Sequence, residues 1–97
     1  MDFERSEAGV CGWFFVQTYE GAPWHGSPDQ LVVTVTSPDE KHIVRPVVKS
    51  LPQTGMFGFD VHPDFLKQEG EYVAVIAAED FSVPPLRRTF NVVHQDR

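Results

Sequence analysis

Apolar and polar residues alternate along much of the chain with the two-residue period of a half-buried β-strand. Residues 30–37 show this most clearly, because Leu31, Val33 and Val35 take every second position and would share one buried face. No segment of ten or more residues has the apolar spacing of an amphipathic helix. Since the strand-like runs recur between clusters of Pro, Gly, Asp and Ser, the pattern predicts an all-β sandwich or small barrel.

Six strands are predicted, and residues 1–9 supply either a short seventh strand or a frayed end. The six lie at residues 11–19, 30–37, 42–49, 56–61, 72–80 and 87–93, and a polar tail follows at 94–97. Ser-Pro-Asp occurs at 27–29 and again at 37–39, and both copies predict turns. Pro46 lacks an N–H, so its strand is expected at a sheet edge or broken by a bulge.

Large apolar residues at alternate positions define the predicted core. It comprises Phe15, Leu31, Val33, Val35, Phe57, Phe59, Tyr72, Ile76, Phe90 and Val92. Residues 72–80 are apolar on both faces, so this strand is either central in its sheet or faces a partner.

Length and charge restrict the class of protein. With 97 residues the chain is predicted to form a single domain, residues 1–97, and its one cysteine, Cys11, allows no internal disulfide. Fourteen acidic against eight basic residues give a net charge of -6, which disfavours nucleic acid and anionic lipid as partners. The longest apolar run, residues 73–78, is too short for a membrane span or a signal peptide, so we expect a cytoplasmic protein without membrane insertion.

Several sequence phrases occur in the order and spacing of a known family. They lie at residues 13–18 (WFFVQT), 21–22 (GA), 31–35 (LVVTV), 55–63 (GMFGFDVHP), 70–75 (GEYVAV) and 89–92 (TFNV). Through these phrases residues 13–93 resemble the filamin-type immunoglobulin repeat. The resemblance implies an immunoglobulin-like antiparallel sandwich of about seven strands, in which Tyr72 sends its hydroxyl back to an upstream backbone group. Other immunoglobulin-like sandwiches share much of this pattern.

The resemblance also implies a protein-binding edge between the third and fourth strands of the fold. An extended protein or peptide would add there as a strand, taking affinity from backbone hydrogen bonds. The corresponding residues here are Leu31, Val32, Val33, Thr34, His42, Ile43, Val44, Arg45, Val47 and Val48. The apolar character of residues 43–48 suits a covered groove, whereas Pro46 also suits an edge that is blunted against aggregation. We favour partner binding, and we expect a non-catalytic protein-interaction or spacer module of an intracellular scaffold or multidomain protein.

No sequence motif for catalysis is found, so we expect neither an enzyme nor a cofactor or metal. The chain lacks a Gly-rich phosphate loop, paired zinc-ligand cysteines and a nucleophile elbow. Cys11 could act only with one of the four histidines, His25, His42, His62 or His94. Asp60, His62 and Asp64 have the spacing of a metal site, but Pro63 predicts a turn between them.

Two alternative functions stay open. One is a small-ligand or carbohydrate-binding sandwich that uses Trp13, Tyr19 and Trp24. The other is a self-associating structural or virion domain, whose apolar face of Val73, Val75 and Ala77 would pack against its own copies.

Overall fold

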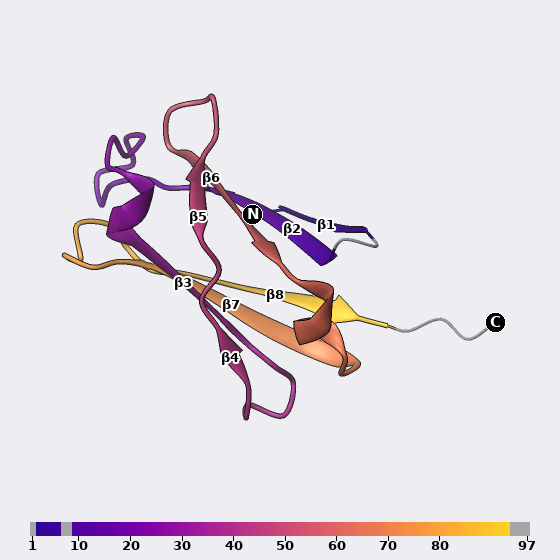
Figure 1. Cartoon of the computed structure of the whole chain (residues 1–97). Coiled ribbons are helices and arrows are strands. Elements are labelled where there is room, and N and C mark those ends of the chain that lie inside the picture. Colours follow the sequence, from indigo (N-terminus) through magenta and orange to yellow (C-terminus); the bar gives the residue numbers. More distant parts are fainter. Residues whose placement is uncertain (1, 7–8, 94–97) are drawn as a thin grey trace.

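The computed structural model describes residues 2–6 and 9–93, which form eight strand segments and two short 3₁₀ turns (Figure 1). The polar tail predicted at 94–97, including His94, lies outside this part of the chain. The strands are β1 (Asp2–Ser6), β2 (Gly9–Phe15), β3 (Leu31–Thr36), β4 (Ile43–Val44), β5 (Val48–Ser50), β6 (Met56–Val61), β7 (Gly70–Ala78) and β8 (Leu86–Val92); the turns are η1 (Pro28–Gln30) and η2 (Pro63–Leu66).

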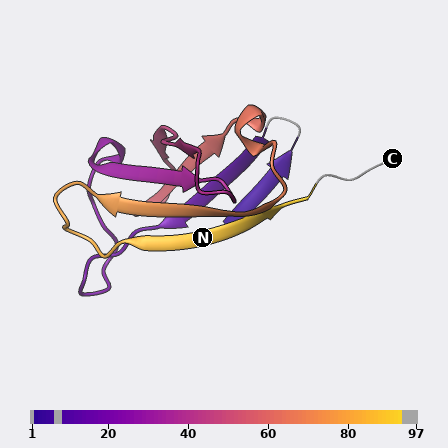
Figure 2. The same cartoon turned by 90° about the horizontal axis from the view of Figure 1, so that it is seen from below.

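Two antiparallel sheets pack face to face as a sandwich. Their strand orders are β1-β2-β6-β5 and β4-β3-β7-β8, and in Figure 2 the orange strand β7 and the yellow strand β8 run side by side in the second sheet. The predicted all-β sandwich is therefore confirmed. The strand order is compatible with the immunoglobulin-like type.

Residues 42–49, predicted as one strand, are divided between the two sheets. β4 pairs with β3 and β5 pairs with β6, so the chain changes sheets at residues 45–47. Pro46 lies in this crossing, where its missing N–H breaks no ladder. Both β4 and β5 lie at sheet edges, as predicted for the strand that contains Pro46, and the break between them is a change of sheet and not a bulge. The eight segments correspond to the seven predicted strands.

The segment at residues 1–9 supplies the seventh strand through β1. Its register with β2 runs from Asp2 opposite Trp13 to Ser6 opposite Gly9. β2 itself ends at Phe15, four residues before the predicted end at Tyr19, because residues 18–22 form a turn in which Thr18 N–H donates to the Ala22 carbonyl at 2.8 Å.

Nine of the ten predicted core residues are buried, and Phe15 is the exception. Phe14 is 1 % exposed and pairs with Phe57 of β6, so Phe15 points to the outer face and its assignment to the core was wrong. Trp13, Phe14, Phe15 and Val16 are all apolar, so alternation cannot tell which of them face inward. The pairing of β2 with β6 decides instead which of these residues face inward.

The doubly apolar strand β7 is central in its sheet, between β3 and β8. Tyr72, Ala74, Ile76 and Ala78 are buried in the core. On the outer face Val73 and Ala77 are half-buried and Val75 is exposed. Of the two alternatives for residues 72–80, a central strand or a strand that faces a partner, the central position is the one observed.

Candidate functional site: an open edge between the two sheets

The edge of β3 is only partly covered by its neighbour β4. β4 is two residues long and pairs with β3 only through Val35 opposite Val44 and Thr36 opposite Ile43. Among residues 9–93, no strand pairs with this side of residues 31–34. Two thirds of β3, residues 31–34, therefore present an unpaired strand edge.

Two hydrogen bonds at the ends of β3 show which backbone groups face that edge. The Gln30 carbonyl accepts from Glu79 N–H on the β7 side, and Ser37 N–H donates to the His42 carbonyl on the β4 side, both at 2.9 Å. Backbone groups of successive residues point to alternate sides of a strand. Leu31 and Val33 therefore direct their groups toward the open side.

One of these groups already has a partner. Leu31 N–H donates to the Pro28 carbonyl and closes η1. The Leu31 carbonyl and both backbone groups of Val33 are left to pair with an added strand. A partner residue opposite Val33 would exchange two hydrogen bonds with it, as in an antiparallel ladder.

The edge of β5 faces the same space from the other sheet. Leu51 N–H donates to the Met56 carbonyl at 3.0 Å, so by the same alternation Val48 and Ser50 direct their backbone groups away from β6. Between β3 and the segment that leads into β5 lies a groove of about 420 Å³, here called the β3–β5 groove. It is lined by Pro28, Asp29, Leu31, Val32, Val33, Arg45, Pro46, Val47 and Val48.

Six of the ten predicted edge residues line this groove: Leu31, Val32, Val33, Arg45, Val47 and Val48. Of the other four, Thr34 lies on β3 beyond the lining, and Val44 packs half-buried against the core. His42 and Ile43 line a different pocket. The prediction missed Pro28 and Asp29, although the Ser-Pro-Asp turn at 27–29 marked where β3 begins.

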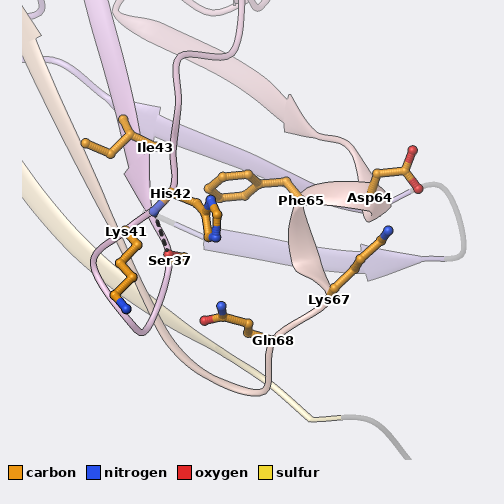
Figure 3. A pocket seen from close by; sticks show the side chains of 8 residues that line it. All are labelled: Ser37, Lys41, His42, Ile43, Asp64, Phe65, Lys67 and Gln68. Atoms are coloured by element: carbon orange, nitrogen blue, oxygen red, sulfur yellow. Dashed lines mark hydrogen bonds between the residues drawn. The ribbon is translucent and has the colours of Figure 1, made fainter.

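The second pocket, here called the hairpin pocket, has a volume of about 630 Å³ and lies between the β3–β4 turn and η2 (Figure 3). Ser37, Lys41, His42 and Ile43 line it from the hairpin, and Asp64, Phe65, Lys67 and Gln68 line it from η2 and the residues that follow. The dashed bond in Figure 3 is donated by His42 N–H to Ser37 Oγ at 3.1 Å.

Asp39 ties the two walls of the hairpin pocket together. Its Oδ1 accepts from Ser37 Oγ at 2.5 Å, and its Oδ2 accepts from Gln68 Nε2 at 2.7 Å. These hydrogen bonds, with one from Lys41 N–H, hold the pKa of the Asp39 carboxyl well below its usual range. The carboxylate orders the turn that precedes β4.

The candidate nucleophile Cys11 contacts Asp60, one of the three candidate metal ligands. Cys11 Sγ donates to Asp60 Oδ1 at 2.7 Å, and Lys49 Nζ donates to Asp60 Oδ2 at 2.7 Å. The bonds from Cys11 and Lys49 lower the pKa of Asp60, and the same ion pair raises the pKa of Lys49. Cys11 thus contacts a carboxylate from the paired strand β6.

Asp60 therefore does not form a cluster with His62 and Asp64, the other two candidate metal ligands. His62 Nδ1 instead accepts from Asp64 N–H at 3.1 Å and caps η2. Across the part of the chain that the structure describes, no group of three His, Cys, Asp or Glu side chains is placed to hold a metal ion.

The three aromatic residues of the carbohydrate-binding alternative do not form one surface. Trp24 is buried in the core with its ring centroid 5.7 Å from that of Phe57. Trp13 lies half-buried on β2, and Tyr19 lies exposed in the turn after it. Trp24 therefore has almost no surface on which a sugar could stack.

No protein-family model, curated protein or solved structure matches the chain. Among the described residues, no helix has the length and apolar character needed to cross a membrane.

Proposed function

We propose that this domain is a non-catalytic protein-interaction module that binds an extended segment of another protein by β-strand addition to the open edge of β3. The observation that carries the proposal is that residues 31–34 of β3 extend past the end of β4 and that the first three of them line an apolar groove. We further propose that the module belongs to a cytoplasmic scaffold of the cytoskeletal, filamin-like kind. The sequence phrases at 13–93 and the strand order support this, and a lone cysteine is typical of a reducing compartment.

Pro46 is compatible with binding at this edge. It lies in the crossing between β4 and β5, so the donor that it lacks does not belong to β3. The two backbone groups of Val33 stay available to a partner. This favours partner binding over the alternative in which Pro46 serves only to blunt the edge.

Backbone hydrogen bonds alone would not hold a partner. Three available groups, at a net gain of about 0.5–1.5 kcal/mol for each bond, do not offset the loss of translational and rotational freedom on association. Apolar contacts must therefore contribute. Val47, which lines the groove, is 82 % exposed, and covering such a side chain contributes about 1.5–3 kcal/mol.

Backbone amide NMR can test this proposal with a panel of extended, β-forming peptides. We expect shifts confined to residues 31–34 and 47–50. Val47→Asp should weaken binding without loss of the fold, since Val47 is so exposed. Val93→Asp, which alters an exposed valine just after β8, at the opposite edge of the sheet, is the matched control and should bind normally. A folded domain whose β3 and β5 amides do not respond to any peptide would contradict the proposal.

A further inference from the structure

The two ends of the β3–β5 groove carry opposite charges. Val44 lies opposite Val35, so Arg45, the next residue, lies at the Thr34 end of the open edge. Asp29 belongs to η1 and comes two residues before Leu31, at the other end. Both side chains are exposed and both line the groove.

Within the part of the chain that the structure describes, Arg45 is not engaged with an acidic residue. Among residues 9–93 no carboxylate lies within salt-bridge distance of its guanidinium, whereas Lys49 at the neighbouring strand is paired with Asp60 at 2.7 Å. The chain carries a net charge of -6. An arginine at the groove of such an acidic domain, without a carboxylate partner among residues 9–93, is available to an anionic group of a binding partner.

Asp29 is held as an ordered carboxylate at the opposite end. Ser27 Oγ donates to its Oδ1, and this bond lowers the pKa of the Asp29 carboxyl. The turn is also fixed by Ser27 N–H, which donates to Gln30 Oε1 at 2.7 Å. At neutral pH Asp29 therefore offers a negative charge in a fixed place.

We infer that the groove selects a strand with an acidic side chain at the Arg45 end, an apolar side chain opposite Val33 and a basic side chain at the Asp29 end. This inference rests on the proposed function, whose site it refines. Cross-strand neighbours share a face, so the residue opposite the buried Val33 points inward and must be apolar. Four strand residues span about 13 Å, which matches the four residues 31–34 between the charged ends.

The direction of the partner strand follows from the charges and from the sheet. Every strand pair in the described residues is antiparallel, and an antiparallel partner meets Arg45 first and Asp29 last. Successive side chains of a strand point to opposite faces, so partner residues opposite Thr34 and Gln30 point outward, whereas those opposite Val33 and Leu31 point inward. The preferred sequence is therefore acid, apolar residue, any residue, apolar residue, base, as in the peptide Glu-Val-Thr-Val-Lys.

The test compares this peptide with the reversed-charge peptide Lys-Val-Thr-Val-Glu and the neutral peptide Gln-Val-Thr-Val-Gln, each capped at both ends. In NMR titrations at low salt we expect the matched peptide to bind about three- to tenfold more tightly than the reversed one, since each exposed ion pair contributes modestly. The difference should shrink as salt is added, because exposed charges are screened.

Substitutions at Arg45 provide the control. Arg45→Glu should remove or invert the preference, whereas Arg45→Lys, which retains the charge, should keep its direction. Equal affinities of the three peptides, with shifts still confined to β3 and β5, would overturn the charge rule and leave strand addition intact. If neither these peptides nor the wider panel shifts the β3 amides, strand addition itself is contradicted.

Discussion

The Tyr72 hydroxyl donates a hydrogen bond to the Gln68 carbonyl at 2.9 Å. The ring is completely buried and stacks on Phe90, with centroids 5.3 Å apart. The bond joins the start of β7 to the segment that follows η2, so one side chain fills the core and also fixes the connection between the sheets. Immunoglobulin-like sandwiches have the same arrangement at the start of their penultimate strand, and it confirms the expectation for Tyr72.

Tyr72→Phe should lower the free energy of unfolding by about 0.5–1.5 kcal/mol, because the part-buried Gln68 carbonyl loses its donor while the ring is retained. Chemical denaturation would measure this change. Gln68→Ala is the matched control, since it keeps the backbone carbonyl and removes only the side-chain bond to Asp39. A Tyr72→Phe protein as stable as the wild type would show that the hydroxyl does not stabilise this connection.

Phe14 and Phe15 give a direct test of how β2 faces the core. Phe14→Ala should cost about 3–5 kcal/mol, as expected for a fully buried aromatic residue, and Phe15→Ala no more than about half of that, because its ring is partly solvated. The two variants change the same residue type at adjacent positions, so each controls for the other. Equal losses of the free energy of unfolding, measured by chemical denaturation, would contradict the assignment of Phe14 to the core face and of Phe15 to the outer face.

The sequence predicts the fold where alternation is unambiguous. In residues 30–37 each apolar residue on the inner face has a less buried neighbour, and β3 has the predicted phase. At Trp13–Val16 no polar residue marks a face, so only pairing with β6 decides the phase. Trp24 lies in an irregular loop and is buried by tertiary contacts. Its ring packs on Phe57 and on Gly26, where a Cβ atom would lie 1.9 Å from the ring.

The sequence predicts the position of the candidate site but not the extent of its open edge. Alternation and the family resemblance locate β3 and the run after it, but they do not say where that run leaves its sheet. The opening at residues 31–34 exists because β4 stops after Val44, and that length is set by the crossing to β5 at Pro46. Asp29 enters the groove through the closure of η1, a tertiary arrangement that a local pattern does not encode.

Acid should weaken the domain partly through Asp39. The folded-state pKa of this carboxyl lies below its ordinary value of 3.8 because Ser37, Gln68 and Lys41 donate hydrogen bonds to it. Its stabilising contribution is therefore fully present above about pH 4 and is lost as the pH falls through the folded-state pKa. Asp39→Asn should be less stable than the wild type at neutral pH, and this difference should shrink as the pH falls below about 4.

Urea unfolding of both proteins between neutral and acidic pH would measure that difference. Glu71→Gln removes one exposed negative charge from β7 and controls for the change in net charge. A difference between wild type and Asp39→Asn that stays constant, or grows, toward low pH would contradict the role given to Asp39.

Phe81 adopts a backbone conformation that is unfavourable for its side chain. It lies in the turn between β7 and β8 with a φ of 58° and an exposed fraction of 80 %, and its N–H donates to the Ala78 carbonyl at 3.1 Å. The left-handed region costs a residue with a Cβ about 1–2 kcal/mol, and glycine recovers this at an entropic cost of about 0.5–1 kcal/mol. Phe81→Gly should therefore raise the free energy of unfolding by up to about 1 kcal/mol.

Phe81→Ala separates the backbone effect from the loss of the ring. Alanine also removes the exposed ring but keeps the Cβ, so it should leave the free energy of unfolding close to that of the wild type. Thermal and chemical denaturation of the three proteins would give the comparison. If glycine proved no more stabilising than alanine at this position, the strain assigned to the turn would be absent.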